Sequence, residues 1–461
     1  NKGVTLTSGA VATNTQNRAL TVDGIVYLDD RTVNAANATE VTVTSDGLDV
    51  GERSLTVTGD EDGYIVNVSS GDIDGVENIG SSDGVTLDGL YTATVQTDKH
   101  GSFTTTDKTF LPSNDSVTYG FRNGSITSIN NTDDVVGDFT DYISVNGDRI
   151  RVVGDSDSQV SLFGDREGVL KIEMDEAGVF EVSGKTYEIQ DDDSFAFNMS
   201  GGAVTGISSL ENGNLVISQN ENDFKLNSKR MSLSGNTSPV TLGVVDSKVD
   251  SVRGLDGSIS GLGNATVYGF TSATINGKRI DVDNSEDLDA IVKDGVATNL
   301  IGLMDGATVN SAPNMTVTTA ENGTFTFVTD PYTLEDTVDA TFDFLTNSES
   351  RVEGIDNFAG SLSGSMAEGL TLNGEKVKVV GDDLVIETDG EKITNISGLK
   401  DGDEINGDFG DATINIPEGN STINGMPFTL ENDPDGASLS GGSIISGLDK
   451  DATLTFGADG T

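Results

Sequence analysis

Short groups of valine, isoleucine, leucine and phenylalanine alternate with polar residues along the whole chain. No stretch sustains apolar residues at the 3.6-residue spacing of an amphipathic helix. Clusters of glycine, asparagine, aspartate and serine interrupt the apolar groups every few residues. Short alternating runs bounded by turn-forming residues are typical of β-strands. The pattern therefore predicts an all-β fold made of many short strands.

One degenerate segment recurs along the chain, and its clearest copies carry Asn-Gly between two alternating runs, as in residues 274–280, 371–377 and 422–428. Asn-Gly in this setting predicts a two-residue hairpin turn, because both turn residues need positive φ. The turn is expected at positions 23, 106, 146, 183, 227, 276, 328, 373 and 424, with one more copy near Thr58-Gly59. These positions predict about ten units averaging about 45 residues.

The hairpin prediction also assigns side chains to faces, because residues alternate between the two sides of a strand. A turn at 424–425 pairs Ile423 with Met426 and places Ser421 opposite Phe428. The apolar face of this hairpin is expected to hold Ile423, Met426, Phe428 and Leu430. Around the turn at 183–184, the residues expected on one face are Phe180, Val182, Tyr187 and Ile189.

A second element recurs between these turns, in residues 204–210, 249–255, 352–358 and 393–399. Apolar residues three apart could indicate a helical turn. The glycine, asparagine and serine embedded in every copy instead predict a short strand followed by a turn. The two elements follow each other in the same order, which indicates a true repeat.

A unit of this size with five or six short strands cannot bury its own apolar face, so neighbouring units must stack or pair. Stacking gives a β-solenoid, and pairing gives tandem β-sandwich domains. Unit length varies while the anchor positions stay constant, which favours a solenoid with insertions as side loops. We expect one continuous array over residues 1–461 without a separate catalytic domain, and we keep the tandem sandwich as the alternative.

The charge of the chain excludes some classes of binding partner and favours others. Its 76 acidic and 26 basic residues give a formal net charge of −50. This excess argues against nucleic acid, whose phosphates require clustered Lys and Arg, and against anionic lipid. It favours solubility and the binding of cations. No apolar run reaches the length of a membrane span, and the absence of cysteine excludes disulfides and thiol chemistry.

Calcium is the cation that the carboxylates fit best, since it takes several oxygen ligands from alternating positions of a turn. The strongest candidates lie in residues 281–289 and are Asp281, Asp283, Asp287 and Asp289. This segment lacks the glycine of an EF-hand loop and has Val292 where a bidentate Glu would stand, so it is not an EF-hand. Shorter candidate clusters contain Asp60, Asp62, Asp433 and Asp435. Each cluster can equally be an ordinary solvated turn.

Catalysis is not expected. A serine triad needs a histidine base, and the single histidine, His100, stands in an expected exposed turn. Paired carboxylates could hydrolyse glycosides, or cleave an acidic polysaccharide with calcium and a basic residue. The candidates for such chemistry are Asp191–Asp193, or the 281–289 carboxylates beside Lys278 and Arg279. A polysaccharide-degrading solenoid is therefore the least favoured alternative.

In the two recurring elements, the chain resembles the repetitive β-strand surface proteins of bacteria: long secreted adhesins, fibre proteins and surface-layer components. The resemblance implies an extracellular or cell-surface location, a role in assembly or adhesion, and no catalytic residues. We expect a structural subunit of a self-assembling filament, pilus-like fibre or surface layer. Strand-like text at residues 4–6 and 452–456 could join copies by β-augmentation. The alternative is a monomeric adhesin stalk that binds a glycan or a host surface.

Overall fold

A computed structural model describes backbone and side chains over most of residues 53–430. For residues 4–50, 154, 160–174, 345–350 and 431–455 it describes only the backbone of strands. The undescribed segments between residues 53 and 430 are 61–63, 70–71, 81–82, 106–107, 155–159, 166–168, 175–176, 183, 191–194, 201–202, 219, 222, 313, 338, 347–349, 382–383, 408, 410–411 and 417.

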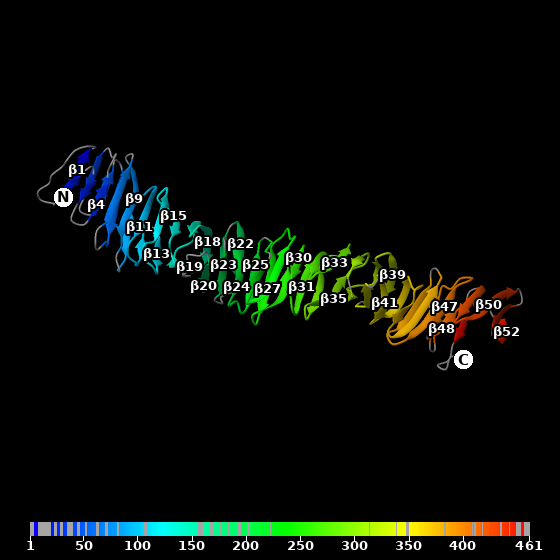
Figure 1. Ribbon diagram of the computed structural model, residues 1–461. Coiled ribbons are helices and arrows are strands. Elements are labelled where there is room, and N and C mark those ends of the chain that lie inside the picture. Colours follow the sequence, from blue (N-terminus) through cyan, green and yellow to red (C-terminus); the bar gives the residue numbers. More distant parts are fainter. Residues whose placement is uncertain are drawn as a thin grey trace. The chain divides into compact units, whose positions relative to one another are not determined.

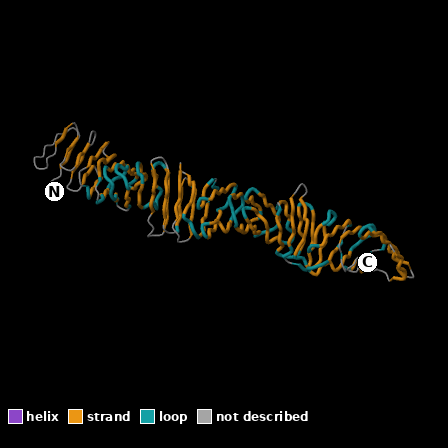
Figure 2. Tube along the Cα trace, turned by 60° about the horizontal axis from the view of Figure 1, so that its bottom comes forward, coloured by secondary structure: helices purple, strands orange, loops and turns teal. Residues whose placement is uncertain are grey.

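Every regular element of the described residues is a β-strand, and Figure 2 accordingly shows strands and loops only. The chain passes back and forth between two sheets and forms stacked coils. Strands of successive coils lie side by side in parallel: Ile129 pairs with Val145, 16 residues later, and Leu300 pairs with Val317, 17 residues later. The protein is therefore a β-solenoid, which confirms the predicted fold class.

The chain forms two compact units, one of residues 1–230 with 243–248 and one of residues 231–242 with 249–461. In each unit the strands follow one another in chain order (Figure 1). Strands with residues in both units are β27 (Lys229–Ser234) in the first sheet, and β28 (Val240–Val245) and β29 (Lys248–Arg253) in the second.

In the first unit, the first sheet contains β1 (Val4–Thr7), β5 (Glu40–Val43), β6 (Gly47–Val50), β7 (Arg53–Thr58), β10 (Val85–Asp88), β12 (Phe103–Thr104), β13 (Thr109–Pro112), β16 (Asp134–Gly137), β19 (Val160–Asp165), β20 (Val169–Met174), β23 (Phe195–Ser200), β24 (Ala203–Ser208) and β26 (Phe224–Leu226). The second sheet contains β2 (Leu20–Val22), β3 (Ile25–Tyr27), β4 (Arg31–Asn34), β8 (Tyr64–Ser69), β9 (Asp72–Ile79), β11 (Ala93–Thr97), β14 (Thr118–Arg122), β15 (Ser125–Asn130), β17 (Ile143–Val145), β18 (Asp148–Gly154), β21 (Gly178–Val182), β22 (Lys185–Gln190) and β25 (Gly213–Ile217).

In the second unit, the first sheet contains β30 (Ser258–Ser260), β32 (Ser272–Ile275), β33 (Lys278–Asp283), β36 (Thr308–Ser311), β38 (Gly323–Phe327), β39 (Asp330–Glu335), β42 (Ala359–Gly364), β45 (Val385–Asp389), β46 (Ile393–Ser397), β48 (Thr413–Asn415) and β53 (Thr453–Thr455). The second sheet contains β31 (Ala265–Phe270), β34 (Leu288–Lys293), β35 (Val296–Leu303), β37 (Met315–Thr319), β40 (Thr341–Thr346), β41 (Ser350–Asp356), β43 (Leu370–Leu372), β44 (Glu375–Val380), β47 (Glu404–Gly407), β49 (Gly419–Ile423), β50 (Met426–Asp433), β51 (Gly436–Gly441) and β52 (Ser443–Leu448).

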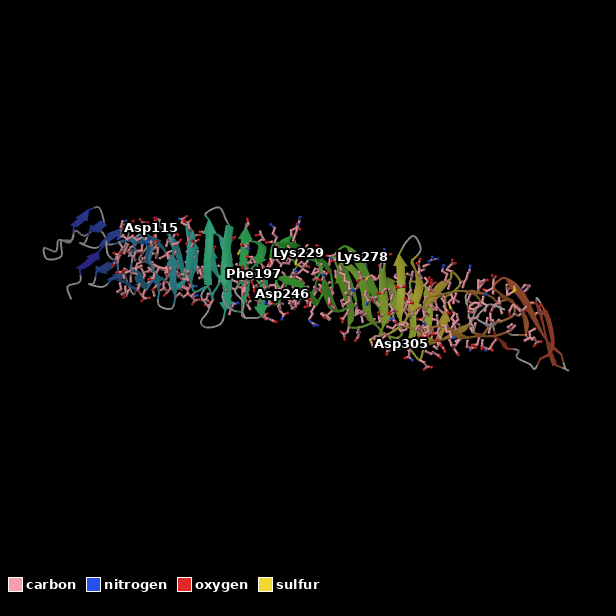
Figure 3. The ribbon with its side chains drawn as sticks, turned by 90° about the horizontal axis from the view of Figure 1, so that it is seen from below. Asp115, Phe197, Lys229, Asp246, Lys278 and Asp305 are labelled. Carbon is pink, nitrogen blue, oxygen red and sulfur yellow. The ribbon has the colours of Figure 1, made fainter. Side chains whose placement is uncertain are left out.

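Aromatic side chains from the two sheets meet in the core of each unit. In the first unit, the ring centroid of Phe197 in β23 lies 4.7 Å from that of Phe180 in β21, and Figure 3 shows Phe197 among the strands. In the second unit, Phe327 in β38 lies 4.7 Å from Phe342 in β40. Full burial of such a side chain stabilises the fold by about 1.5–3 kcal/mol.

Hairpins are present at the predicted turns 146, 227, 276, 328, 373 and 424. The predicted turn positions 23, 106 and 183 lie outside the described residues, and the strands on either side of each pair with one another. Asn276-Gly277 has φ of 47° and 83°, and the other described Asn-Gly turns between hairpin strands likewise have positive φ at both residues. Phe180, Val182, Tyr187 and Ile189 are all buried on one face, as expected.

At the 424–425 turn, Ile423 pairs with Met426 and Ser421 with Phe428, as predicted. Ile423 and Leu430 are buried. Met426 lies on the same face as predicted, because it pairs with Ile423, but its side chain is 47% exposed.

The copy expected near Thr58-Gly59 is wrong. β7 belongs to the first sheet and β8 to the second, so the chain crosses between sheets here and forms no hairpin. Gly59 has φ of 89°, and a Cβ atom at this position would lie 2.6 Å from the carbonyl oxygen of Gly84. Glycine is thus needed here for a close backbone approach rather than for a hairpin turn.

The sequence unit and the solenoid coil are different lengths. The repeat that begins with the hairpin of β32 and β33 has six strands, β32 to β37, and the chain passes through each sheet twice before the next hairpin, β38 and β39. The next repeat has only five strands, β38 to β42, so the hairpin that begins at β43 lies in the other sheet. The expected five or six strands per unit is confirmed for these units, and one unit spans one and a half to two coils. From β17 to β21 the unit has four strands.

Within the described residues, no helix is long and apolar enough to cross a lipid bilayer.

Candidate functional site

The asparagine of the hairpin turn joins two successive coils. The backbone N–H of Asn276 donates to the carbonyl oxygen of Ile259 at 2.8 Å. Its side-chain oxygen accepts from the N–H of Leu262 at 3.1 Å, and its Nδ2 donates to the carbonyl oxygens of Leu262 at 3.0 Å and of Gly295 at 2.8 Å. We call this arrangement, an asparagine in a hairpin turn bonded to the loop of the preceding coil, an asparagine clasp.

The clasp recurs in both units. Asn146 accepts from the N–H of Thr132 at 3.3 Å and donates to its carbonyl at 2.8 Å. Asn373 makes the same pair of bonds to Phe358, at 3.1 and 2.6 Å. Two further copies keep part of the pattern: Asn227 donates to the carbonyl of Leu210 at 2.5 Å, and Asn424 accepts from the N–H of Gly407 at 2.8 Å.

The clasp connects the two sequence elements in two places: Asn227 bonds to Leu210, at the end of the copy in residues 204–210, and Asn373 bonds to Phe358, at the end of the copy in residues 352–358. In each complete clasp, an isoleucine at the end of a strand accepts from the backbone N–H of the asparagine, and the residue three positions later bonds to the side chain of that asparagine. In the complete clasps, that later residue is Thr132, Leu262 or Phe358, and all three side chains are buried. Its side chain anchors the loop in the core while its backbone receives the asparagine. The bonds from Asn227 and Asn373 to the copies at 204–210 and 352–358 were not predicted from the sequence; the fixed order of the two elements was the available signal.

Several carboxylates join coils in a comparable way. Asp305, labelled in Figure 3, accepts from the N–H of Thr324 at 2.6 Å, while Gly306 N–H donates to the Thr324 carbonyl at 2.9 Å. Asp401 accepts from the N–H of Asn420 at 2.7 Å, and Gly402 N–H donates to the Asn420 carbonyl at 2.6 Å. These aspartates therefore act as hydrogen-bond acceptors at the start of the next strand.

The four principal calcium candidates are spread over two sheets. Asp281 and Asp283 lie in β33, Asp289 lies in β34 of the other sheet, and Asp287 lies in the connecting turn. Asp281 pairs with Arg279 Nη2 at 2.9 Å, and Asp283 accepts from Asn310 Nδ2 at 2.9 Å. Asp289 accepts from the N–H of Gly269 at 3.1 Å.

The shorter calcium candidates are only partly described. Asp60 accepts from the N–H of Gly80 at 3.2 Å. Asp62 and Asp435 lie outside the described residues, as do Asp191–Asp193, and only the backbone of Asp433 is described. In the described part of the chain, no three His, Asp or Glu side chains gather in a way that could hold a metal ion. Calcium binding stays a prediction.

His100 is exposed, as expected, and its Nδ1 lies 3.0 Å from Asp115. The hydrogen bonds from His100 hold the pKa of Asp115 below its ordinary value. This pair links the loop before β12 to the loop before β14 and is a surface contact between neighbouring segments.

Two ion pairs reach into the core of the first unit. Lys108 Nζ, in a side chain only 7% exposed, lies 2.9 Å from Asp141, and this contact with Lys108 holds the pKa of Asp141 below its usual value. Lys185 Nζ lies 2.7 Å from the buried Glu221, which also accepts a hydrogen bond from the hydroxyl of Tyr187. Burial, and then the bond to Glu221, raises the pKa of Tyr187.

A polar groove of about 390 Å³ crosses the second sheet of the second unit. Its floor is Gly354 in β41, which pairs with Asp343 on one side and with Thr371 on the other. Burial, followed by the charges of Asp356 and Glu353, raises the pKa of Asp343. The remaining lining residues are Thr298, Asn314, Met315, Thr316 and Phe344.

Comparisons with known proteins leave the function open. No family model matches the chain, and no curated protein or solved structure matches it either.

Proposed function

We propose that the chain is an extracellular structural protein, a subunit of a self-assembling filament, pilus-like fibre or surface layer. The observation that carries the proposal is the asparagine clasp, which recurs in both compact units and ties the hairpins that contain it to the preceding coil. In a solenoid, stability is a sum of terms between neighbouring coils, so a repeated joint strengthens the array throughout its length. This distribution suits a protein whose task is mechanical continuity.

Charge supports the same function. The net charge of −50 keeps a long protein soluble and opposes indiscriminate association. Assembly then requires directional contacts, such as strand pairing between copies. The strands β1 and β53, near the two ends of the sequence, are the candidates for this pairing.

Sedimentation velocity of the full chain tests the proposal. The chain is examined at increasing protein concentration, once with calcium and once after treatment with EDTA. Species whose size grows with concentration support self-assembly, and their loss in EDTA would make calcium part of the joint between copies. A monomer at every concentration in both conditions would contradict the polymer function.

The polar groove favours a second candidate, a monomeric adhesin that binds a glycan. Hydroxyl, amide and carboxylate groups line the groove, and these are the groups that hydrogen-bond to sugar hydroxyls. A glycan array probed with the intact chain and with Asp343→Ala tests it. Binding to a defined glycan that disappears in the variant supports the adhesin, whereas equal binding by both proteins removes the groove from consideration.

A further inference from the structure

The chain contains eight Asn-Gly dipeptides, and their asparagines differ sharply in how the side chain is held. Asn-Gly is the dipeptide most open to attack on the side-chain amide, because glycine has no side chain to shield its own backbone nitrogen. The eight asparagines are Asn123, Asn146, Asn212, Asn276, Asn322, Asn373, Asn406 and Asn424.

The clasps fix the side-chain amide at both ends. In Asn146, Asn276 and Asn373, the oxygen accepts from a backbone N–H and Nδ2 donates to a backbone carbonyl of the preceding coil. Attack on the amide carbon would require these bonds to open. Asn212 accepts from the N–H of Asp246, Asn406 donates to Glu404, and Asn424 accepts from the N–H of Gly407.

Asn123 provides the contrasting case with the same turn geometry. Asn123 and Gly124 have φ of 53° and 84°, close to the 47° and 83° of Asn276 and Gly277. Asn123 is exposed and, within the described residues, its side chain has no hydrogen bond. The single restraint is on the attacking nitrogen, because Gly124 N–H donates to the carbonyl oxygen of Tyr91 at 3.0 Å. Asn322, before Gly323, is likewise exposed and free of described side-chain bonds.

We infer that Asn123 and Asn322 are sites of spontaneous deamidation in the folded protein, and that the clasps protect the other turn asparagines from it. The backbone nitrogen of Gly124 attacks Cγ of Asn123 and forms a new C–N bond. The bond from Cγ to the amide nitrogen breaks, that nitrogen takes the glycine proton, and ammonia leaves. Water then opens the five-membered imide ring at either carbonyl, giving aspartate or its β-linked isomer.

The two outcomes have different consequences for the solenoid. At Asn123 the product adds one negative charge at the tip of a hairpin, where the side chain makes no hydrogen bond within the described residues. At Asn276 the same change would replace an Nδ2 donor by a carboxylate facing the carbonyl oxygens of Leu262 and Gly295. By slowing deamidation, the bonds of the clasp preserve the Nδ2 donor that joins the two coils.

Peptide mapping by mass spectrometry tests the inference on the intact recombinant chain, aged at mildly alkaline pH and in parallel in urea. Three side-chain bonds must open at Asn276, against the single bond of Gly124 N–H at the Asn123 turn. A neutral hydrogen bond changes an opening equilibrium by a factor of about five, so the difference of two bonds predicts about 25-fold slower deamidation at Asn276. In urea the deamidation rates of Asn123 and Asn276 should converge, because unfolding removes the clasp. Only the small effect of the neighbouring sequence then remains.

Two results would overturn the inference. One is folded protein in which Asn276 or Asn373 deamidates as fast as Asn123. The other is a difference between Asn123 and Asn276 that persists unchanged in urea, since that would assign it to local sequence rather than to the clasp.

Discussion

At the scale of single residues, the asparagine of the hairpin turn meets two demands at once. It accepts positive φ at lower cost than most residues, and its amide supplies both a donor and an acceptor to the backbone of the preceding coil. Glycine would meet only the first demand. This double use explains why Asn, rather than Gly, occupies the first turn position at 146, 227, 276, 373 and 424.

Replacing Asn276 by glycine separates these two demands. Asn276→Gly keeps the turn but removes three side-chain hydrogen bonds, so we expect a loss of about 2–3 kcal/mol in local stability. Hydrogen exchange should show faster exchange at the amide of Leu262. Asn123→Gly is the matched control, since that turn has no clasp, and it should change little. Equal effects at the two positions would refute the clasp.

Val328 occupies the position of the clasp asparagine in another repeat of the sequence. Its N–H donates to the carbonyl of Val309 at 2.9 Å, as the clasp asparagines donate to their strand-end residue, and its φ is 59°. Such a conformation is costly for a β-branched residue. Val328→Asn should relieve this cost and reach the backbone of Ala312, giving a gain of about 1–2 kcal/mol.

Thermal unfolding measures that gain. Val296→Asn is the control, because Val296 is similarly exposed, at 44% against 41% for Val328, but lies within β35. A melting temperature of Val328→Asn at or below that of the parent chain would contradict the assignment.

At the scale of elements, the hairpins were predictable because their signals are local. Asn-Gly determines the turn, and alternation then determines which residues share a face, as around 183–184. The element of residues 204–210 was correctly expected as a strand and turn: it is β24 and the residues after it. Its role as the second strand of a hairpin with β23, containing a β-bulge between Asn198 and Met199, was not predicted.

Other features depend on distant contacts and had no local signal. The sheet that carries each hairpin depends on how many crossings separate it from the previous one, and crossings have no distinct sequence. Asp305 and Asp401 could not be recognised as backbone acceptors because their partners lie 19 residues later. The groove around Gly354 likewise arises from strands that are distant in sequence.

The groove carboxylate Asp343 should reduce stability at neutral pH. Its pKa is raised, mainly by burial, so its ionised form is disfavoured in the folded state. The resulting cost applies above the folded pKa and disappears as pH falls below the ordinary value of 3.8. Because the group is largely solvated, we expect Asp343→Asn to raise stability by less than about 1 kcal/mol at neutral pH.

Melting temperatures at neutral and acidic pH measure this effect. The gain of Asp343→Asn should close as pH falls below 3.8. Asp74→Asn, at an exposed position of β9, is the control for the change in net charge. An Asp343 variant that gains no more than the Asp74 variant would exclude a special cost at the groove.

At the scale of the whole molecule, repulsion among carboxylates opposes the folded chain. The 76 acidic residues exceed the 26 basic ones by 50, so most carboxylates on the stacked coils have no basic residue to pair with. Salt screens such repulsion over about 10 Å at 0.1 M. The protein should therefore depend on ionic strength more than a neutral protein of its size.

Thermal unfolding in increasing sodium chloride measures this dependence. We expect the melting temperature to rise by a few degrees as salt is added, since screening stabilises the compact acidic state. Calcium chloride at equal ionic strength separates screening from specific binding: a larger rise indicates bound calcium, and an equal rise indicates screening alone. A melting temperature that falls with sodium chloride would contradict the repulsion.

Electron microscopy of the protein from its native source, with and without EDTA, tests the structural function most directly. A self-assembling structural protein should form regular fibres or sheets with a constant repeat between subunits. Fibres that disperse in EDTA would identify calcium as the joint between copies, and fibres that persist would assign the joint to strand pairing. Dispersed single molecules under both conditions would contradict the account.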